Sequence, residues 1–175
     1  MLGKFRPERI DHFYGAFFIQ NHIMVVMESA PCGPLVDCIK KRREPDDTIK
    51  TKPMLDAAKG LVYLHSNESH HLDINPDNVL VFDGEQGFQV NSKQTDFGNS
   101  RNINLLMTNM TFTKGIGTPV FMASDILNKE KYKKSGGVFL FGVIVFECDK
   151  WGQACPKAVQ VPMNNLVVCP GMEEA

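Results

Sequence analysis

Hydrophobic and polar positions in the first 43 residues predict a strand hairpin followed by a short helix. Two apolar runs fill residues 13–28 and are separated by Gln20-Asn21, which is the pattern of a β-hairpin. The segment Ser29-Ala30-Pro31-Cys32-Gly33-Pro34 cannot continue a strand, because its prolines remove ladder donors. Residues 35–43 carry apolar positions before a basic end, which favours a short helix with cations at its C-terminus.

A second helix is predicted directly after Pro53. The charged residues 43–52 indicate an exposed link, and the following segment then repeats apolar positions at helical intervals. This spacing predicts an amphipathic helix with one buried face. The positions assigned to that face are Leu55, Ala58, Leu61, Val62 and His65.

The middle of the chain combines short strands with a polar loop. Residues 70–78 are polar and contain Pro76, which predicts a loop, and residues 79–82 form a short buried strand. A second strand is expected to end at residue 96. Functional residues concentrate on loops held by a rigid scaffold, so chemistry is expected in this region.

The last third of the chain gives weaker patterns. Residues 99–125 show no period, which predicts a long surface loop of the kind that is usually functional. Residues 138–148 are apolar all round. Their β-branched and aromatic content favours a strand, while the unbroken length equally permits a buried helix. No element is predicted after Trp151.

Composition restricts the class of protein. A chain of 175 residues with 43% hydrophobic and 22% charged residues fits one ordinary globular domain. Nineteen basic and twenty acidic residues give 19 − 20 = −1, so no broad electrostatic attraction to nucleic acid or to an anionic membrane is expected. Any phosphate binding is therefore expected to be local.

Cysteine content and apolar run lengths predict an intracellular, soluble protein. The five cysteines include no CxxC pair, so neither a closed disulfide framework nor a standard zinc site is indicated. The first residues lack the apolar stretch of a signal peptide. The longest apolar run, residues 138–146, is far shorter than the roughly 20 residues that span a bilayer, so no membrane segment is expected.

Three motifs follow one another in an informative order. They are HLDINPDN at residues 71–78, DFG at 96–98 and GTPVFMA at 117–123. In this order the sequence resembles the eukaryotic protein kinase family, most closely the Ser/Thr kinases of the tyrosine-kinase-like group, from about residue 3 to residue 152. Each motif alone is weak, since Asp-Phe-Gly is also an ordinary turn.

The resemblance implies an α+β, protein-kinase-like fold that is incomplete. Residues 1–30 would be the remnant of the small lobe, namely its last strands, ending at the hinge. Residues 31–152 would be a partial, mostly helical large lobe, and residues 153–175 a divergent tail. The glycine-rich loop and strand lysine of the family are expected ahead of the hairpin, and the 175 residues contain neither.

The resemblance also implies ATP-dependent phosphoryl transfer to Ser or Thr of a protein substrate. This chemistry needs a carboxylate that orients the attacking hydroxyl and accepts its proton, and oxygen ligands that hold Mg²⁺ on the phosphates. Asp73 matches the catalytic carboxylate of the family. Asn78 and Asp96 match its metal ligands, with ATP and Mg²⁺ as the cofactors.

Adenine binding is implied at the hinge. Met27 corresponds to the gatekeeper, Glu28 and Ala30 to the residues whose backbone meets adenine, and Leu80 to the floor beneath the ring. For Met27 and Leu80, simple core packing is the alternative interpretation. The resemblance also pairs His71 with Phe97 in an apolar column that supports the catalytic loop.

Several residues depart from the family pattern. Leu72 replaces the arginine that would pair with a phosphorylated activation loop, and Asn75 replaces a lysine near the transferred phosphoryl group. Gly137 replaces an aspartate that anchors the catalytic loop. Asp11 lies where the family has an aliphatic residue, and its carboxylate is expected to prefer water.

Three hypotheses remain open from the sequence. The chain is an active Ser/Thr protein kinase, a catalytically inactive pseudokinase-like module that binds a partner, or a kinase fragment that does not fold stably. The retained Asp73, Asn78 and Asp96 favour the first hypothesis. The lack of a glycine-rich loop argues against the first hypothesis, and Leu72 and Asn75 favour the second. The third rests on the apolar residues 138–146, which would lack the helices that cover them in the family and would leave an exposed patch.

Overall fold

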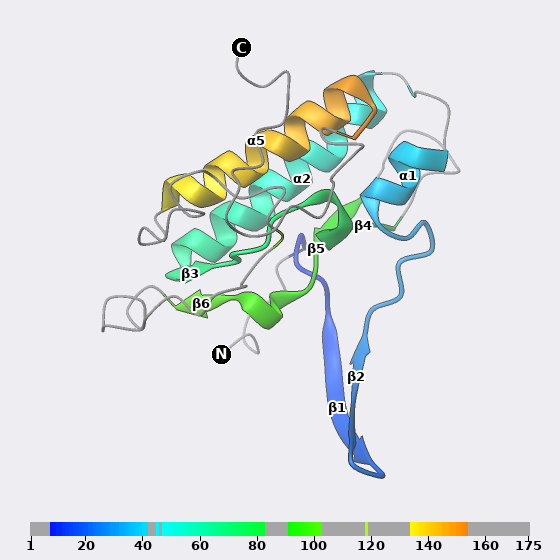
Figure 1. The fold of residues 1–175 in the computed structure, drawn as a ribbon, viewed down its shortest axis with the longest axis vertical. Coiled ribbons are helices and arrows are strands. Elements are labelled where there is room, and N and C mark those ends of the chain that lie inside the picture. The colour runs from blue at the N-terminus through cyan, green and yellow to red at the C-terminus, as the bar shows by residue number, and fades with distance from the viewer. Residues whose placement is uncertain are drawn as a thin grey trace, which may run out of the picture.

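The computed structural model describes residues 8–41, 45, 47–82, 91–102, 118 and 134–153. The expectations for residues 103–117, for 119–125 and for the tail after residue 153 lie outside these ranges. In the described part, helices α2 and α5 lie side by side, and three small sheets accompany them (Figure 1). The elements are β1 (Phe13–Ile19), β2 (His22–Met27), α1 (Leu35–Lys41), α2 (Asp47–Ser66), β3 (Ser69–His70), the 3-10 turn η1 (Pro76–Asn78), β4 (Val79–Val81), β5 (Ser92–Gln94), the 3-10 turn η2 (Phe97–Asn99), β6 (Arg101–Asn102) and α5 (Lys134–Lys150).

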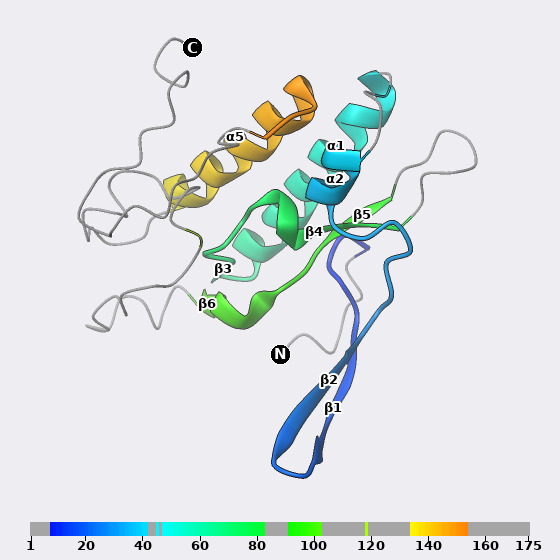
Figure 2. The ribbon, with the colours of Figure 1, turned by 45° about the vertical axis from the view of Figure 1, so that its right-hand side comes forward.

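The predicted hairpin is confirmed as the antiparallel pair β1 and β2. Gln20 and Asn21 form its turn, and both have positive φ values, 45° and 67°, as a two-residue hairpin turn requires. The hairpin extends away from the helices in both views (Figures 1 and 2). Its apolar side chains are exposed on both strands, up to 78% for Phe18.

Helix α1 is confirmed, whereas α2 differs from its prediction. It begins at Asp47 and runs through Pro53, so the expected link is mostly helical. Asp47 lies in the first turn, where a negative charge suits the helix dipole. Burial of Pro53 and packing of Ile49 against the core offset the backbone hydrogen bond that proline removes.

The buried face of α2 also differs from the prediction. Leu61 is buried as expected, but Leu55 and Val62 are exposed, and Ala57 and Leu64 take their place. Positions 57, 61 and 64 lie on one helical stripe, and Ala57 and Leu61 belong to the same core cluster as Leu140 and Ile144 of α5. The sequence spacing fits both the stripe with Leu55 and Val62 and the neighbouring stripe with Ala57 and Leu64. The position of α5 decides that the second stripe is the buried one.

Residues 138–148 form a helix, so the strand favoured by propensity is wrong and the buried-helix alternative is correct. Helix α5 lies along α2 (Figures 1 and 2), with Ile144 and Cys148 fully buried. Burial against a helix thus overrides β propensity. The core joins this pair to α1 and β4. Its buried members are Leu35, Cys38, Ile39, Ala57, Leu61, Ile74, Val79, Val81, Leu140, Ile144 and Cys148.

Two short sheets frame the polar loop at residues 71–78. Strand β3 pairs with β6 on one side of the loop, and β4 pairs with β5 on the other, both antiparallel. The predicted strand at 79–82 is therefore confirmed. No helix in the described ranges is long and apolar enough to cross a membrane. Small antiparallel sheets and packed helices make this an α+β fold.

Candidate active site

The polar loop between β3 and β4 is shaped by its own sequence. The side chain of Asn75 caps η1, because its Oδ1 accepts hydrogen bonds from the amides of Asp77 at 2.9 Å and Asn78 at 3.1 Å. Pro76 occupies the first position of this turn, where its missing N–H costs nothing. The loop thus has a defined conformation in which Asp73 and Asn78 lie on either side of the cap.

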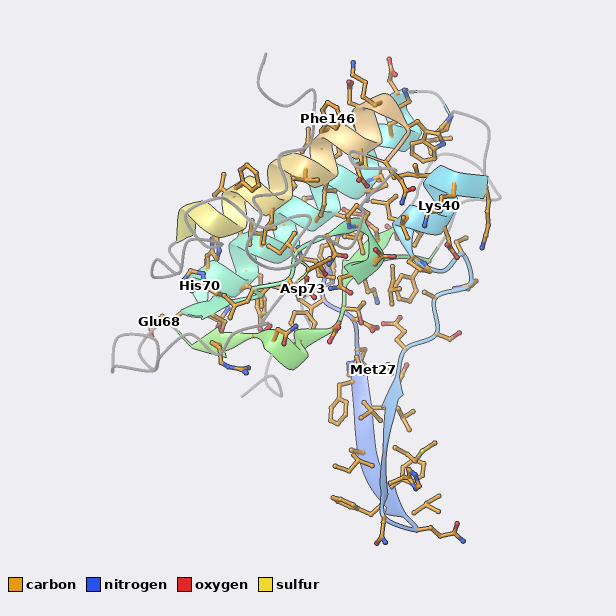
Figure 3. All side chains as sticks on the ribbon, viewed as in Figure 1. Met27, Lys40, Glu68, His70, Asp73 and Phe146 are labelled. Atoms are coloured by element: carbon orange, nitrogen blue, oxygen red, sulfur yellow. The ribbon has the colours of Figure 1, made fainter. Side chains whose placement is uncertain are left out.

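Asp73 is held in place through its carboxylate. Its Oδ1 accepts hydrogen bonds from the Asn75 Nδ2 at 2.9 Å, and from the backbone amide and hydroxyl of Thr118 at 3.0 Å and 2.9 Å. Figure 3 shows Asp73 near the centre of the body, and Met27 at the end of the hairpin nearest to it. A carboxylate with three donors on one oxygen keeps a fixed orientation.

Asn78 is connected directly to Asp73. Its Nδ2 donates to the Asp73 carbonyl oxygen at 2.8 Å, which fixes the side-chain amide. Among the described residues no donor reaches the Asn78 Oδ1. The structure therefore brings Asp73 and Asn78 together and leaves an amide oxygen available for a cation.

Asp96 follows β5 and has a left-handed backbone, with φ 56° and ψ 67°. Its side chain is exposed, and Oδ1 accepts a long hydrogen bond of 3.3 Å from the Gly98 amide. The preceding residue, Thr95, donates its backbone amide to the carbonyl of Asn78 at 3.0 Å. This bond ties the residue before Asp96 to the loop that carries Asn78.

His71 and Phe97 lie in contact as expected, with ring centroids 5.0 Å apart. The His71 Nε2–H donates to the carbonyl of Thr95 at 2.8 Å. Burial lowers the pKa of His71 below its ordinary value, and the Thr95 carbonyl only partly opposes this. A neutral, buried imidazole therefore joins the polar loop at residues 71–78 to the segment of Asp96.

Leu72 and Asn75 are both buried in this loop. Leu72 has a φ of 68° and belongs to the core, so no guanidinium is present there. Asn75 is 3% exposed, and its Nδ2 approaches the Thr118 hydroxyl at 3.4 Å as well as Asp73. A short neutral amide therefore joins Asp73 to Thr118.

The loop after β2 is attached to β4 by backbone hydrogen bonds. The Cys32 amide donates to the Val81 carbonyl at 3.2 Å, and the Val81 amide donates to the Gly33 carbonyl at 2.8 Å. Pro34 forms a β-bridge with Leu80, which is half-buried. The structure thus brings Leu80 beside the loop that follows the hairpin.

Glu28 and Ala30 are both anchored in this loop. The Glu28 amide donates to the His12 carbonyl at 2.9 Å, and its carboxylate pairs with the Lys93 ammonium at 2.6 Å. The same ammonium lies 4.6 Å from the centre of the Phe82 ring. The Ala30 carbonyl accepts a hydrogen bond from the Gly33 amide at 3.1 Å. The Ala30 amide donates no hydrogen bond to any residue of the described ranges.

The expectation that Asp11 prefers water is wrong. Its residue surface is only 5% exposed, and its Oδ2 accepts a hydrogen bond of 2.8 Å from the Thr95 hydroxyl. Burial raises the pKa of this carboxyl, while the Thr95 hydroxyl and the His12 amide oppose the rise. Sequence reasoning missed this contact because 84 positions separate Asp11 from Thr95 and no local pattern joins them.

The donor set fits Mg²⁺ in chemical type. An exposed carboxylate on Asp96 and a side-chain amide oxygen on Asn78 are hard oxygen ligands, which Mg²⁺ prefers, and Mg²⁺ is usually bound by few protein ligands together with phosphates. The described residues contain no cluster of three or more His, Cys, Asp or Glu that could hold a metal alone. A site with two protein ligands therefore needs phosphate oxygens or water to complete it.

Comparison with known proteins agrees with this fold. The fold is of the protein-kinase-like class, and the sequence profile described as "Protein kinase domain" matches residues 1–156. The chain belongs to the protein kinase family. This family generally uses ATP and Mg²⁺.

Several curated relatives are similar over most of this chain. A probable serine/threonine-protein kinase, gdt9 of Dictyostelium discoideum, is 30% identical over 84% of this chain and 11% of its own length. A putative serine/threonine-protein kinase/receptor, R831 of Acanthamoeba polyphaga mimivirus, is 36% identical over 83% of this chain and 9% of its own. Serine/threonine-protein kinase fray1 of Dictyostelium discoideum is 31% identical over 84% of this chain and 25% of its own length. The chain thus spans a quarter or less of these relatives.

Proposed function

We propose that this chain carries the large-lobe half of a phosphoryl-transfer site that binds ATP with Mg²⁺ and acts on Ser or Thr of a protein. The observation that carries the proposal is the joined pair of Asp73 and Asn78. The hydrogen bond between them runs from the Asn78 Nδ2 to the Asp73 backbone carbonyl, so it fixes the Asn78 amide and leaves its oxygen for a cation. The Asp73 carboxylate is oriented separately by Asn75 and Thr118. Asp96, tied to the same loop through Thr95, supplies the second oxygen ligand.

Each residue has a separate role in the proposed reaction. Asp73 orients the substrate hydroxyl and accepts its proton, with one carboxylate oxygen fixed by Thr118 and Asn75 and the other left for the hydroxyl. Asn78 and Asp96 hold Mg²⁺, which when bound neutralises charge on the phosphates. The family membership and the oxygen donors of this loop support these roles.

Adenine is proposed to bind against the loop that follows β2. The backbone groups of Glu28 and Ala30 would meet the adenine edge, and Leu80 would lie beneath the ring. The backbone bonds between this loop and β4 support the proposal, because they hold Leu80 beside the loop. The Glu28 ion pair with Lys93 supports a fixed hinge.

The lobe boundaries and the location of the protein are proposed on the same basis. Residues 1–30 would belong to the small lobe, 31–152 to the large lobe and 153–175 to a divergent tail. Assignment to the tyrosine-kinase-like group and an intracellular location are part of this proposal. Cysteine usage without a disulfide pattern supports the location.

A pseudokinase-like binding module is the second candidate function, and two observations favour it. Leu72 places an apolar side chain where the family has an arginine, and Asn75 places a neutral amide where it has a lysine. Loss of one preorganised electrostatic donor typically lowers a rate by about 10²–10³-fold. Such a module would bind a protein partner, with or without nucleotide.

One experiment separates the two functions. The full chain is incubated with Mg²⁺, labelled ATP and a general Ser/Thr protein substrate, beside Asp73→Asn as the matched control. Phosphate transfer that Asp73→Asn abolishes supports the enzyme. The absence of transfer, together with a thermal shift produced by ATP and Mg²⁺, supports the nucleotide-binding module. If neither phosphate transfer nor a thermal shift is observed, the proposed ATP site is contradicted.

A further inference from the structure

Thr95, the residue directly before Asp96, is held by three hydrogen bonds to two distant segments. Its amide donates to the Asn78 carbonyl at 3.0 Å, and its carbonyl accepts from the His71 Nε2 at 2.8 Å. Both partners belong to the catalytic loop. Its hydroxyl donates to the Asp11 carboxylate at 2.8 Å, so the third bond comes from the N-terminal segment.

Asp11 is fixed by its own backbone. Its amide donates to the Gln94 carbonyl at 2.8 Å, the Gln94 amide donates to the Arg9 carbonyl at 3.0 Å, and Ile10 forms a parallel bridge with Gln94. Residues 9–11 thus run along β5. The Asp11 carboxylate therefore reaches Thr95 from a segment that is itself hydrogen-bonded to β5.

The carboxylate of Asp11 is buried and needs its partner. Burying a carboxylate is costly unless hydrogen bonds satisfy it, and the Thr95 hydroxyl is such a donor. The charged groups that act on it are Glu28 and Lys93, which pair with each other. Their opposite charges partly cancel, so the hydroxyl is the main specific contact of Asp11.

We propose that Asp11 is a positioning residue for the metal-binding carboxylate of Asp96 and acts through the hydroxyl of Thr95. The proposal rests on the proposed function, in which Asp96 holds Mg²⁺. Asp96 has a left-handed backbone, a conformation that persists only when neighbouring contacts hold it. Because the Thr95 peptide leads directly into Asp96, a bond that fixes Thr95 also fixes the direction of the Asp96 side chain.

The first measurement is hydrogen exchange of the Thr95 amide in the full chain without nucleotide. Asp11→Val removes the acceptor and leaves a partly buried hydroxyl without its partner, so exchange at Thr95 is expected to rise about tenfold relative to amides of α2. Asp11→Asn keeps an acceptor oxygen and should remain close to the wild type. Ile144→Val, a buried change in α5 that removes none of the hydrogen bonds of Thr95, is the matched control for a loss of global stability.

The second measurement is the Mg²⁺ concentration that gives half of the thermal shift produced by saturating ATP. Residues that orient metal ligands typically change metal affinity by about 10–100-fold when they are replaced. Asp11→Val is therefore expected to raise this concentration about tenfold, while Asp11→Asn and Ile144→Val leave it within about threefold of the wild type. A purely structural role for Asp11 would lower the melting temperature without moving the Mg²⁺ dependence.

The outcomes are distinguishable. If the wild-type chain shows an Mg²⁺-dependent thermal shift that Asp96→Asn abolishes but Asp11→Val leaves unchanged, the Asp11 proposal alone is overturned. Unchanged exchange at Thr95 in Asp11→Val overturns it as well. A wild-type chain without any Mg²⁺-dependent shift overturns the proposed function and this proposal together.

If the Asp11→Val chain does not fold, a second set of variants tests the proposal. Thr95→Val has nearly the same volume and removes the same hydrogen bond from the other side. The double variant with Asp11→Val leaves no polar group of this pair buried and is expected to fold. The double variant should show the same rise in the Mg²⁺ requirement, and a requirement equal to that of the wild type contradicts the proposal.

Discussion

At the residue scale, Asn75 performs two structural tasks with one side chain. Its oxygen caps η1 by accepting the amides of Asp77 and Asn78, and its nitrogen donates to the Asp73 carboxylate. A lysine has no side-chain acceptor and could not form this cap. The substitution away from the family pattern therefore removes a cation and adds local order to the loop.

Two variants at this position separate the tasks. Asn75→Ala is expected to lower the free energy of unfolding by about 1 kcal/mol, because both capped amides lose their acceptor. Asn75→Ser keeps a capping oxygen and loses the contact with Asp73, so it should lose only a few tenths of a kcal/mol, about the spread among good capping residues. Urea denaturation of both variants measures the difference.

The control for this prediction is Lys41→Ala. This residue pairs with Asp37 on the exposed surface of α1, where an ion pair contributes little. Its unfolding midpoint should equal that of the wild type. Equal losses in Asn75→Ala and Asn75→Ser would contradict the capping role of the oxygen.

At the element scale, α2 is approached closely by two other segments. A Cβ added at Gly60 would lie 3.0 Å from the Gln94 Oε1 and 3.1 Å from the Arg9 carbonyl oxygen. Nearby, the fully buried Asp56 pairs with Arg9 at 3.0 Å and accepts from the Ser92 amide at 3.1 Å. The strand edge that holds Asp11 is thus fastened to α2, and the gap at Gly60 permits that approach.

A matched pair of glycine substitutions tests this packing. In Gly60→Ala, the gain in helix propensity of about 1 kcal/mol is opposed by overpacking against a backbone carbonyl, which typically costs about 1–3 kcal/mol. We expect net destabilisation in urea denaturation. Gly142→Ala in α5 meets no atom within 4 Å, so it should stabilise the chain by up to about 1 kcal/mol. Stabilisation by both variants would contradict the close approach at Gly60.

At the scale of the whole molecule, the core lies between α2, α5, α1 and β4, while the β1–β2 hairpin extends away from it. The proposed catalytic residues lie where these parts meet. Asp73 and Asn78 are on the loop next to the core, and the proposed hinge residues Glu28 and Ala30 lie between the hairpin and α1, beside Leu80 on β4. Motion of the hairpin would therefore reach the proposed site through Glu28 and Asp11.

Thiol labelling followed by peptide mass analysis reports on the integrity of this core. Burial raises the pKa of Cys148 to about 12, with a further contribution from Glu147, so almost no thiolate is present at neutral pH. We expect Cys148 to be modified only at the rate of unfolding, whereas the half-buried Cys32 reacts in the native chain. Equal rates at both thiols without denaturant would contradict the packing of α5 on α2.

The sequence alone was sufficient wherever a local rule decides the structure. The Gln20-Asn21 turn predicted the hairpin, Pro76 predicted the loop, and the order of the three motifs predicted the family. The relation of Asp73 to Asn78 is also local, because Pro76 and the Asn75 cap set the turn between them. Turn chemistry acts over a few residues and needs no distant partner.

Only the tertiary structure decided the features that depend on distant contacts. Helix α5 is a helix because α2 covers it, and the buried stripe of α2 is chosen by α5, against the stripe that contains Leu55 and Val62. Asp11 is buried because Thr95, far away in the sequence, supplies a donor. Burial is a property of the assembled chain, so a pattern that fits two structures equally is resolved only when the packing partner is in place.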